Sequence, residues 1–286
     1  MKNQVCIITG ANSGIGKETA LSLAKLGATV ILLCRNYERG NIALKSIITE
    51  SNNKNVELML CDLSSQNSIS DFISKFKNKY DSLNVLINNA GILLNKRTIS
   101  VDGVENTFAI NHLGPFILTN SLLDLLKSSS PSRIINVSSS AHYRANFDLD
   151  NMQGEKKYSS FEAYCKSKLY NVLFTYELSR KLAGSNVTVN CLHPGFIPTN
   201  LFANSSFFYK AIVKILSPIL IDAKSGSKTS TYLATSKDVE NITGKYFVKC
   251  KPKQSSKISY DKSASKNLWD ISEKLVNYNK SAEGRI

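Results

Sequence analysis

The sequence predicts an α/β fold in which one doubly wound parallel sheet is covered by helices on both faces. Short β-prone apolar runs alternate with stretches of about 10–15 residues at helical spacing, which is the order of βαβ units. The first run ends in a glycine-rich turn that opens a helix, and small or polar residues follow several later runs. With 286 residues, 42% of them hydrophobic, the chain suits a single domain over residues 1–286. We expect about seven strands in the order 3-2-1-4-5-6-7.

The first strand and the turn after it form a candidate nucleotide-binding segment. Val5–Ile8 is a β-prone run, and apolar residues return at helical spacing from Ile15. The glycines follow the spacing G-x-x-x-G-x-G, a variant of the dinucleotide fingerprint. A helix N-terminus there exposes unpaired N–H groups that suit a pyrophosphate, although a purely structural turn uses glycine too. Its position between a buried strand and a helix favours a Rossmann-type cofactor cradle made of Gly10, Asn12, Ser13, Gly14, Ile15 and Gly16.

The second strand, Thr29–Cys34, indicates which dinucleotide binds. NAD-binding folds carry an acidic residue near the end of this strand, where it hydrogen-bonds the ribose 2′-hydroxyl. Cys34 and Arg35 occupy that place here. Because arginine suits a 2′-phosphate and the carboxylate is missing, we predict NADP (NADPH), with NAD less favoured. The alternative is that Arg35 only points into solvent.

The next two βα units extend the same edge of the sheet. The pattern predicts two helices and two strands, over Tyr37–Thr49, Val56–Leu60, Ser65–Lys79 and Leu83–Ile87. Open parallel sheets bind ligands at the carboxyl ends of their strands. We therefore expect cofactor contacts from Asp62, Leu63, Asn89, Ala90 and Gly91. Asp62 either bonds an adenine amine or caps the following helix.

A long apolar helix is expected next, over Val104–Leu126. Pro115 lies inside its helical periodicity, which predicts a kink and freed backbone groups near Asn111. The fifth strand, Arg133–Val137, ends in three serines at 138–140.

The helix Phe161–Leu182 carries a candidate acid/base pair. Tyr164 and Lys168 are four residues apart, so they share one face. A nearby ammonium stabilises phenolate and lowers the pKa of tyrosine from about 10, which makes a general acid/base for an alcohol and its carbonyl. One such pair is expected by chance in a chain this rich in tyrosine and lysine, so the context decides. The sixth strand, Val187–Leu192, ends in His-Pro-Gly at 193–195.

Together these motifs resemble the short-chain dehydrogenase/reductase superfamily, through TGANSGIG, CDL, NNAG, the asparagine at 111, the serines at 138–139, YCKSK and PG. The resemblance implies that Ser139 polarises the substrate carbonyl and that Tyr164 transfers the proton. It implies that Lys168 lowers the pKa of that tyrosine and holds the nicotinamide ribose, a cofactor contact that Tyr164 shares. It implies that Asn111 maintains the kinked helix and a water-mediated proton path. Cofactor contacts also follow for Pro194, Gly195 and Thr199.

The chain is similar in particular to the retinol dehydrogenase branch, through LLCRN, DGVENTFAINHLGPF, PSRIINVSSSAH, YCKSKLYNVLFTYEL, HPG and GKYFVKCK. The branch uses NADP(H) on retinoids, long-chain aldehydes or other lipophilic carbonyls, so we expect a lipophilic alcohol or carbonyl as substrate. Two departures are visible. Many members carry an N-terminal membrane segment, which we do not expect here, and many have histidine where this chain has Pro115.

Two segments outside the core motifs have open roles. Residues 196–222 are rich in large apolar side chains and correspond to the family's lid over the nicotinamide. This apolar lid suits a lipophilic carbonyl, but it could also rest on a membrane surface or form core or oligomer packing. A C-terminal extension, about 250–286, contains a helix around Ala264–Tyr278 that packs on the sheet or on a second subunit of a homo-oligomer.

Composition narrows the possible cofactors, cellular location and partners of the protein. The six cysteines form no C-x-x-C pair, which indicates reduced thiols in a cytoplasmic protein and no metal site. No apolar stretch approaches about 20 residues, so we expect no transmembrane segment, although peripheral membrane contact stays open. The net charge of +14 comes without a nucleic-acid-binding motif, so we interpret it as a solvated basic surface. His112 and His142 are expected to pack or cap, and Ser138 and Ser140 to be scaffold. The rival functions are a reductase of a polar or steroid-like carbonyl and a non-catalytic NADP-sensing scaffold.

Overall fold

A single mixed sheet organises the part of the chain that the structure describes, which in this computed structural model is residues 1–195 and 222–283. The strand order is β3-β2-β1-β4-β5-β6-β7-β8, so the predicted order is confirmed and an eighth strand is added. Neighbouring strands pair in parallel from β3 to β7, and β8 pairs antiparallel with β7. The strands are β1 (Val5–Thr9), β2 (Thr29–Cys34), β3 (Val56–Leu60), β4 (Val85–Asn88), β5 (Ser132–Val137), β6 (Val187–His193), β7 (Tyr246–Val248) and β8 (Lys251–Lys253).

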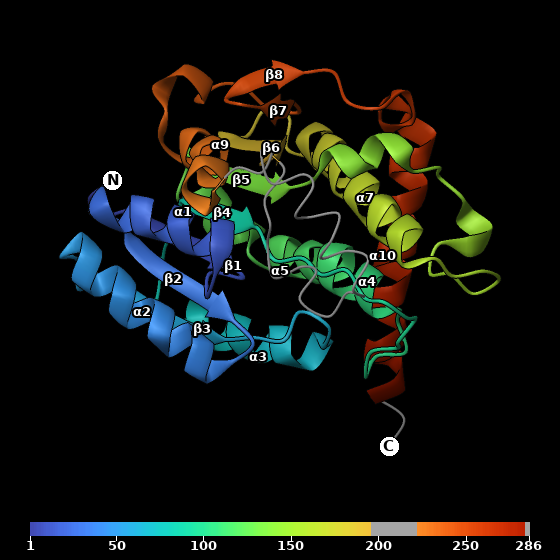
Figure 1. Ribbon diagram of the computed structural model, residues 1–286, viewed down its shortest axis with the longest axis horizontal. Coiled ribbons are helices and arrows are strands. Elements are labelled where there is room, and N and C mark those ends of the chain that lie inside the picture. The colour runs from blue at the N-terminus through green and yellow to red at the C-terminus, as the bar shows by residue number, and fades with distance from the viewer. Residues whose placement is uncertain (196–221, 284–286) are drawn as a thin grey trace.

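Helices cover both faces of this sheet (Figure 1). The helices α1, α2 and α9 lie on one face, and α3, α5, α7 and α10 lie on the other (Figure 1). Their bounds are α1 (Gly14–Lys25), α2 (Tyr37–Ser51), α3 (Gln66–Lys77), α5 (Gly114–Ser121), α6 (Leu123–Ser128), α7 (Ser160–Lys181), α9 (Ala223–Thr235) and α10 (Lys262–Glu283). Short helical turns join them, as α4 (Asn106–Phe108), η1 (Ala109–Leu113), η2 (Ser140–Arg144), η3 (Leu149–Asn151), η6 (Lys237–Val239) and η7 (Lys257–Tyr260).

The strands read as continuous apolar runs because both of their faces are buried. Along β1, Val5 and Ile7 belong to the core under α3, α5, α7 and α10, while Cys6 and Ile8 belong to the core under α1 and α9. The sheet is thus clamped between two apolar layers, and only its strand ends and edges reach the surface.

The prediction of one continuous helix over Val104–Leu126 is wrong. The chain there forms α4, one π-helical turn (η1), α5 and α6 in succession. The predicted kink is present: Pro115 lies in the first turn of α5, and the Gly114 N–H donates to the Ala109 carbonyl, five residues back. The wider turn places Asn111 at its centre and leaves no gap, because Gly114 packs on the Leu63 carbonyl, which an added Cβ would approach to 2.5 Å.

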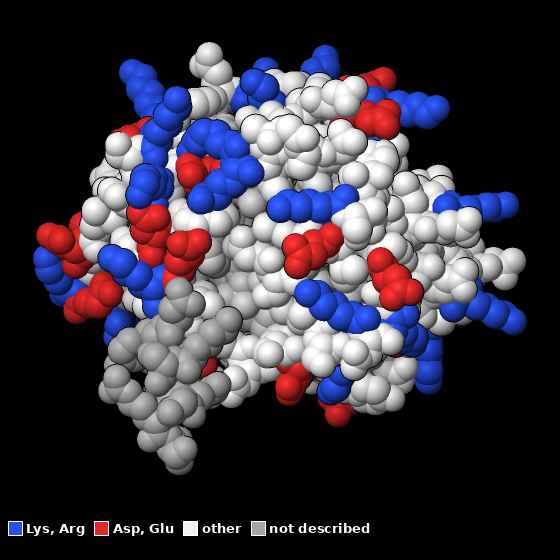
Figure 2. All heavy atoms as spheres, turned by 180° about the vertical axis from the view of Figure 1, so that it is seen from behind, with Lys and Arg blue, Asp and Glu red and all other residues white. Residues whose placement is uncertain are grey.

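Thiols and charges have the placement expected from composition. All six cysteines are free; Cys250 is half-buried and the other five are buried, where burial raises the pKa of the Cys6 thiol to about 12. Figure 2 shows basic side chains spread over one face with acidic ones between them. Such mixed charge indicates a solvated surface on that face rather than a continuous basic track.

Candidate functional site

The loops after β1 and β4 form one interlocked unit. The Thr9 hydroxyl accepts the N–H groups of Asn89 and Ala90, each at 2.9 Å, and the Asn89 amide donates to the Thr9 carbonyl at 2.8 Å. A Cβ at Gly16 would lie 2.5 Å from both the Asn89 amide nitrogen and the Gly10 carbonyl oxygen. Gly10 has φ of +65°, and a Cβ there would lie 3.0 Å from Ala90 Cα. Glycine is therefore required at both positions for the turn to close on the β4 loop.

The turn presents the N-terminus of α1 as a candidate anion site. Gly14 begins this helix with φ of +55°, and Ser13 precedes it in an extended conformation. Among the residues that the structure describes, the Ser13 side chain makes no capping hydrogen bond and the first turn holds no acidic residue. The first N–H groups of a helix need partners, and here a pyrophosphate fits them. We call this unit, residues 9–16 with Asn89 and Ala90, the glycine cradle.

The end of β2 holds the residues expected to choose the dinucleotide. Cys34 is buried beneath the cradle; burial raises the pKa of its thiol to about 11, and the backbone N–H groups of Ala11 and Asn12 oppose that shift. Arg35 is exposed, with its guanidinium 3.9 Å from the Asp62 carboxylate. The other Asp62 oxygen accepts from the Ser64 N–H at 2.9 Å and from the Ser64 hydroxyl at 2.6 Å.

One of the two predicted roles of Asp62 is wrong. The helix α3 is capped by Ser65, whose hydroxyl accepts the Ser68 N–H. Asp62 instead faces Arg35 at the same strand-end edge of the sheet.

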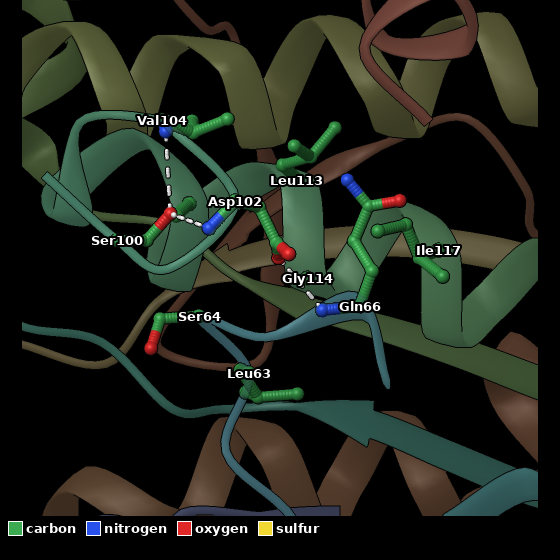
Figure 3. Close-up of a pocket in the computed structure, with 10 residues that line it drawn as sticks. Leu63, Ser64, Gln66, Ser100, Asp102, Val104, Leu113, Gly114 and Ile117 are labelled. Carbon is green, nitrogen blue, oxygen red and sulfur yellow. Dashed lines mark hydrogen bonds between the residues drawn. The ribbon is translucent and has the colours of Figure 1, made fainter. Parts of the chain in front are cut away.

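Leu63 lines a small pocket of about 10 Å³, shown in Figure 3. Its wall is held by Asp102, whose carboxylate accepts the Gln66 N–H at 2.8 Å, and by Ser100, whose hydroxyl accepts two N–H groups of its own turn. A space of this volume holds about one water molecule, so it is not a substrate site.

Asn111 joins the π turn to two other elements. Its side-chain oxygen accepts the Ile92 N–H at 2.8 Å, and its amide donates to the Ile92 carbonyl and to the Ser167 hydroxyl, both at 2.9 Å. The side chain is completely buried. Asn111 thereby fixes the loop after β4 against α7, next to the first turns that carry Tyr164.

Lys168 lies at the centre of the predicted proton-transfer residues. Its ammonium donates to the Val137 carbonyl at 3.1 Å and lies 5.6 Å from the centroid of the Tyr164 ring. A Cβ on Gly91 would lie 3.1 Å from the same nitrogen and 3.5 Å from the Asn111 side-chain oxygen. Burial lowers the pKa of Lys168 to about 8. The structure thus brings Gly91, Asn111, Tyr164 and Lys168 together.

The serines after β5 divide as expected. Ser138 is buried, and its hydroxyl donates to the Lys168 carbonyl at 2.7 Å, which ties the end of β5 to α7. Ser139 begins η2, which packs against α7, and its hydroxyl oxygen accepts the Ala141 N–H at 3.2 Å. A hydroxyl that accepts one bond keeps its proton for donation. Among these residues, the sequence assigns no role to Ser167, although it lies inside YCKSK, and gives no signal for the backbone carbonyl of Val137.

The predicted structural role of His112 is confirmed by its surroundings. The ring is buried among Phe108, Phe116, Tyr170 and Phe174, and its Nε2 contacts the Ser272 hydroxyl at 2.9 Å. Burial lowers the pKa of His112 to about 3, so the ring is neutral at physiological pH.

The remaining predicted site residues follow β6. Pro194 and Gly195 continue from its carboxyl end, and Gly195 has φ of +100°. Thr199 and residues 196–221 of the predicted lid lie outside the described residues.

Comparison with known proteins fits this arrangement. Residues 4–208 match the family model described as short chain dehydrogenase. The chain belongs to the short-chain dehydrogenase family. It is 43% identical to human retinol dehydrogenase 13 over 276 residues, covering 94% of this chain and 83% of that protein. It is 41% identical to human retinol dehydrogenase 11 over 272 residues, covering 95% and 85%. The chain is therefore an oxidoreductase acting on CH–OH groups, in the retinol dehydrogenase-like branch of the family.

Solved structures share the fold. An uncharacterised protein of Mycobacterium paratuberculosis superposes with a TM-score of 0.79 at 32% identity, covering 96% of this chain and 94% of that one. The RhlG protein of Pseudomonas aeruginosa, solved as an NADP active-site complex, superposes with a TM-score of 0.69 at 21% identity, covering 86% and 94%. The second likeness shows the fold alone.

The described residues contain no helix that combines the length and hydropathy needed to span a bilayer. They also contain no group of three His, Cys, Asp or Glu side chains placed to hold a metal ion.

Proposed function

We propose that this protein interconverts a lipophilic alcohol and its aldehyde or ketone with NADP(H), and acts as a reductase where NADPH is abundant. The observation that carries the proposal is the buried Lys168 ammonium, which lies 5.6 Å from the centroid of the Tyr164 ring and packs against Gly91 of the β4 loop. A buried cation beside a phenol favours the phenolate form, and hence proton exchange with an alcohol or carbonyl.

Four side chains divide the proton chemistry. Tyr164 donates the proton to the carbonyl oxygen during reduction and takes it back during oxidation. Lys168 stabilises the phenolate and holds the nicotinamide ribose, and Ser139 donates a hydrogen bond to the substrate oxygen. Asn111 holds the π turn against the β4 loop and α7 through its bonds to Ile92 and Ser167, and we assign to it the water-mediated proton path.

The glycine cradle suits the pyrophosphate of a dinucleotide, because its two obligatory glycines close the turn on the β4 loop and the Ser13 side chain does not cap the first N–H groups of α1. When bound, NADPH supplies the hydride, and the protein supplies position and electrostatics. Arg35 is exposed and spans toward Asp62, so its guanidinium can turn to a 2′-phosphate while Asp62 stays for the adenine amine. Cys34 offers no carboxylate to a 2′-hydroxyl, which favours NADP over NAD.

The lipophilic substrate class rests on two supports. Relatives that are 41–43% identical to this chain are named retinol dehydrogenases, and the segment 196–222 is rich in Phe, Tyr, Ile and Leu. The apolar composition of that segment suits an apolar carbonyl and the exclusion of water.

The test is NADPH consumption by the purified protein against a panel of carbonyls that runs from polar sugars through steroids to retinal and long-chain aldehydes. We expect turnover to be highest with the apolar members and to fall about 10²–10⁴-fold in Tyr164→Phe, which lacks the transferable proton. Tyr158→Phe, which changes a tyrosine outside the pair, is the matched control. NADPH binding without turnover of any carbonyl would instead indicate a nucleotide-sensing scaffold, and an unchanged rate in Tyr164→Phe would remove the proposed acid.

A further inference from the structure

His142 connects Ser139 to the C-terminal part of the chain. The ring is fully buried and belongs to the third residue of η2. Its Nδ1 lies 2.6 Å from the Ser139 carbonyl oxygen, and its Nε2 lies 3.1 Å from the Ser256 backbone nitrogen. Ser256 lies 114 residues from His142 in the chain. No motif in the sequence links them.

The two partners fix the tautomer of the ring. A carbonyl oxygen can only accept, so Nδ1 must carry the hydrogen; a backbone N–H can only donate, so Nε2 must present its lone pair. Protonation would place an N–H at Nε2 against the Ser256 N–H. Burial lowers the pKa of His142, which agrees with a neutral ring in this position.

The Ser139 carbonyl is held from two directions. It accepts the backbone N–H of His142 at 3.2 Å and the ring N–H at 2.6 Å. Because the carbonyl and the side chain of Ser139 share one Cα, these bonds restrict the rotation of the backbone that aims the hydroxyl. Ser139 itself is half-buried and its hydroxyl bonds only within η2 among the contacts seen, so the backbone must supply its orientation.

The segment on the other side of the ring is itself anchored. The Tyr143 hydroxyl donates to the Gln254 carbonyl, and the Ser255 hydroxyl contacts the Tyr176 hydroxyl at 2.7 Å. Residues 254–256 thus bind both η2 and α7, just after the edge strand β8. The aromatic rings of Tyr143 and Tyr246, centred 4.0 and 4.8 Å from the imidazole, close the remaining sides.

We propose that His142 is a positioning residue for the reaction: held as the Nδ1–H tautomer by the Ser256 N–H, it fixes the Ser139 backbone so that the Ser139 hydroxyl meets the substrate oxygen. The C-terminal extension is therefore part of the active-site scaffold. This inference rests on the proposed function, because it assigns His142 through the role of Ser139.

A backbone donor can be removed here by proline. Ser256 has φ of −61°, which proline adopts without strain, and it precedes η7 in a non-helical stretch. Ser256→Pro deletes the N–H that His142 accepts. Ser256→Ala keeps that N–H and loses only a hydroxyl that has no partner among the described residues, so it is the matched control.

In turnover with NADPH and the best carbonyl of the panel, we expect Ser256→Pro to lower kcat about tenfold, with KM for NADPH unchanged, because misplacing one catalytic group costs rate rather than cofactor affinity. Ser256→Ala should stay within about twofold of wild type. Equal kcat in the two variants, with both folded by circular dichroism, would overturn the proposal.

Two variants of His142 test the proposal if Ser256→Pro does not fold. His142→Ala removes both bonds, whereas His142→Asn restores a side-chain N–H near the position of Nδ1. We expect the asparagine variant to recover most of the kcat that the alanine variant loses. Equal losses of kcat in both variants would overturn the proposal, because they would mean that only the volume of the ring matters.

A spectroscopic measurement separates this inference from the proposed function. Nitrogen-15 NMR of histidine-labelled protein should show His142 with a protonated Nδ1 and an unprotonated Nε2 at neutral pH, and the Nε2 signal should shift in Ser256→Pro. That result needs no turnover, so it stands even if the carbonyl panel gives none. A signal from a protonated Nε2 would overturn the proposed bond from the Ser256 N–H to His142, while leaving the proposed function intact.

Discussion

The glycine cradle and the proton-transfer residues are built by opposite means. The cradle is defined by atoms that are missing: at Gly16 a single methyl group would collide with Asn89 and with the Gly10 carbonyl. Around Lys168 the geometry is defined by side chains that reach across elements, from β5, η1 and α7. Changes in the first region should therefore act on cofactor affinity, and changes in the second should act on the catalytic rate.

The largest expected effect tests the second region. Lys168→Met keeps the length of the side chain but removes the ammonium, and we expect kcat to fall about 10²–10³-fold because the phenolate loses its cation. In the wild type, activity that needs the charged lysine should decline as pH rises through its pKa of about 8.

The lowered pKa of Lys168 also predicts how the free energy of unfolding changes with pH. Folding disfavours charged Lys168, so this residue costs stability below pH about 8, and the free energy of unfolding should rise between pH 8 and its unfolded pKa near 10.5. Urea unfolding of wild type and Lys168→Met across that range measures it. The rise should be missing in the variant, and a matching rise in both proteins would contradict the assignment.

The next effect tests the cradle. Gly16→Ala should weaken NADPH binding by at least tenfold, about 1.4 kcal/mol, because the added methyl must displace Asn89 or the Gly10 carbonyl. Isothermal titration measures the affinity. Gly184→Ala is the control: it strains a backbone with φ of +83° in open space and should lower stability without changing affinity. A large loss of kcat with normal NADPH affinity in Gly16→Ala would break the comparison between the two regions.

The smallest effect sharpens the comparison within the cofactor side. Arg35→Ala should weaken NADPH binding several-fold and leave NADH binding unchanged, because an exposed guanidinium on a phosphate contributes about 1 kcal/mol. Arg39→Ala, on the first turn of α2, is the matched control for a lost surface charge. Equal losses for both dinucleotides would assign Arg35 to general attraction of anions.

The sequence contains most of the fold and of the cradle because their signals are contiguous. The apolar runs locate six of the strands, the doubly wound fold type gives their order and a seventh strand, and the glycine spacing gives the turn that Gly10 and Gly16 close. The edge strand β8 escapes prediction because Lys-Pro-Lys has no apolar pattern, and the division of the 104–126 helix escapes it because a π turn depends on where a carbonyl finds its donor.

The candidate site is only partly predictable from the sequence, because only some of its signals are contiguous in the chain. Tyr164 and Lys168 stand on one helix face and can be paired from spacing alone. The bonds that orient them involve Ser138, Ser167 and the Val137 carbonyl. Both serines lie inside family motifs, but their partners are set by tertiary contacts, and a backbone carbonyl carries no sequence signal. His142 was expected only to pack or cap, because its partner Ser256 lies 114 residues away.

The last strand of the sheet has a consequence for how copies of the protein can meet. A bare parallel sheet edge is a template on which another chain can add a strand and begin aggregation. Here β8 covers the β7 edge with three exposed residues, two lysines flanking a proline that has no N–H to offer. Its brevity and like charges make strand addition on that side unfavourable, so self-association at this end of the molecule has no β-sheet route.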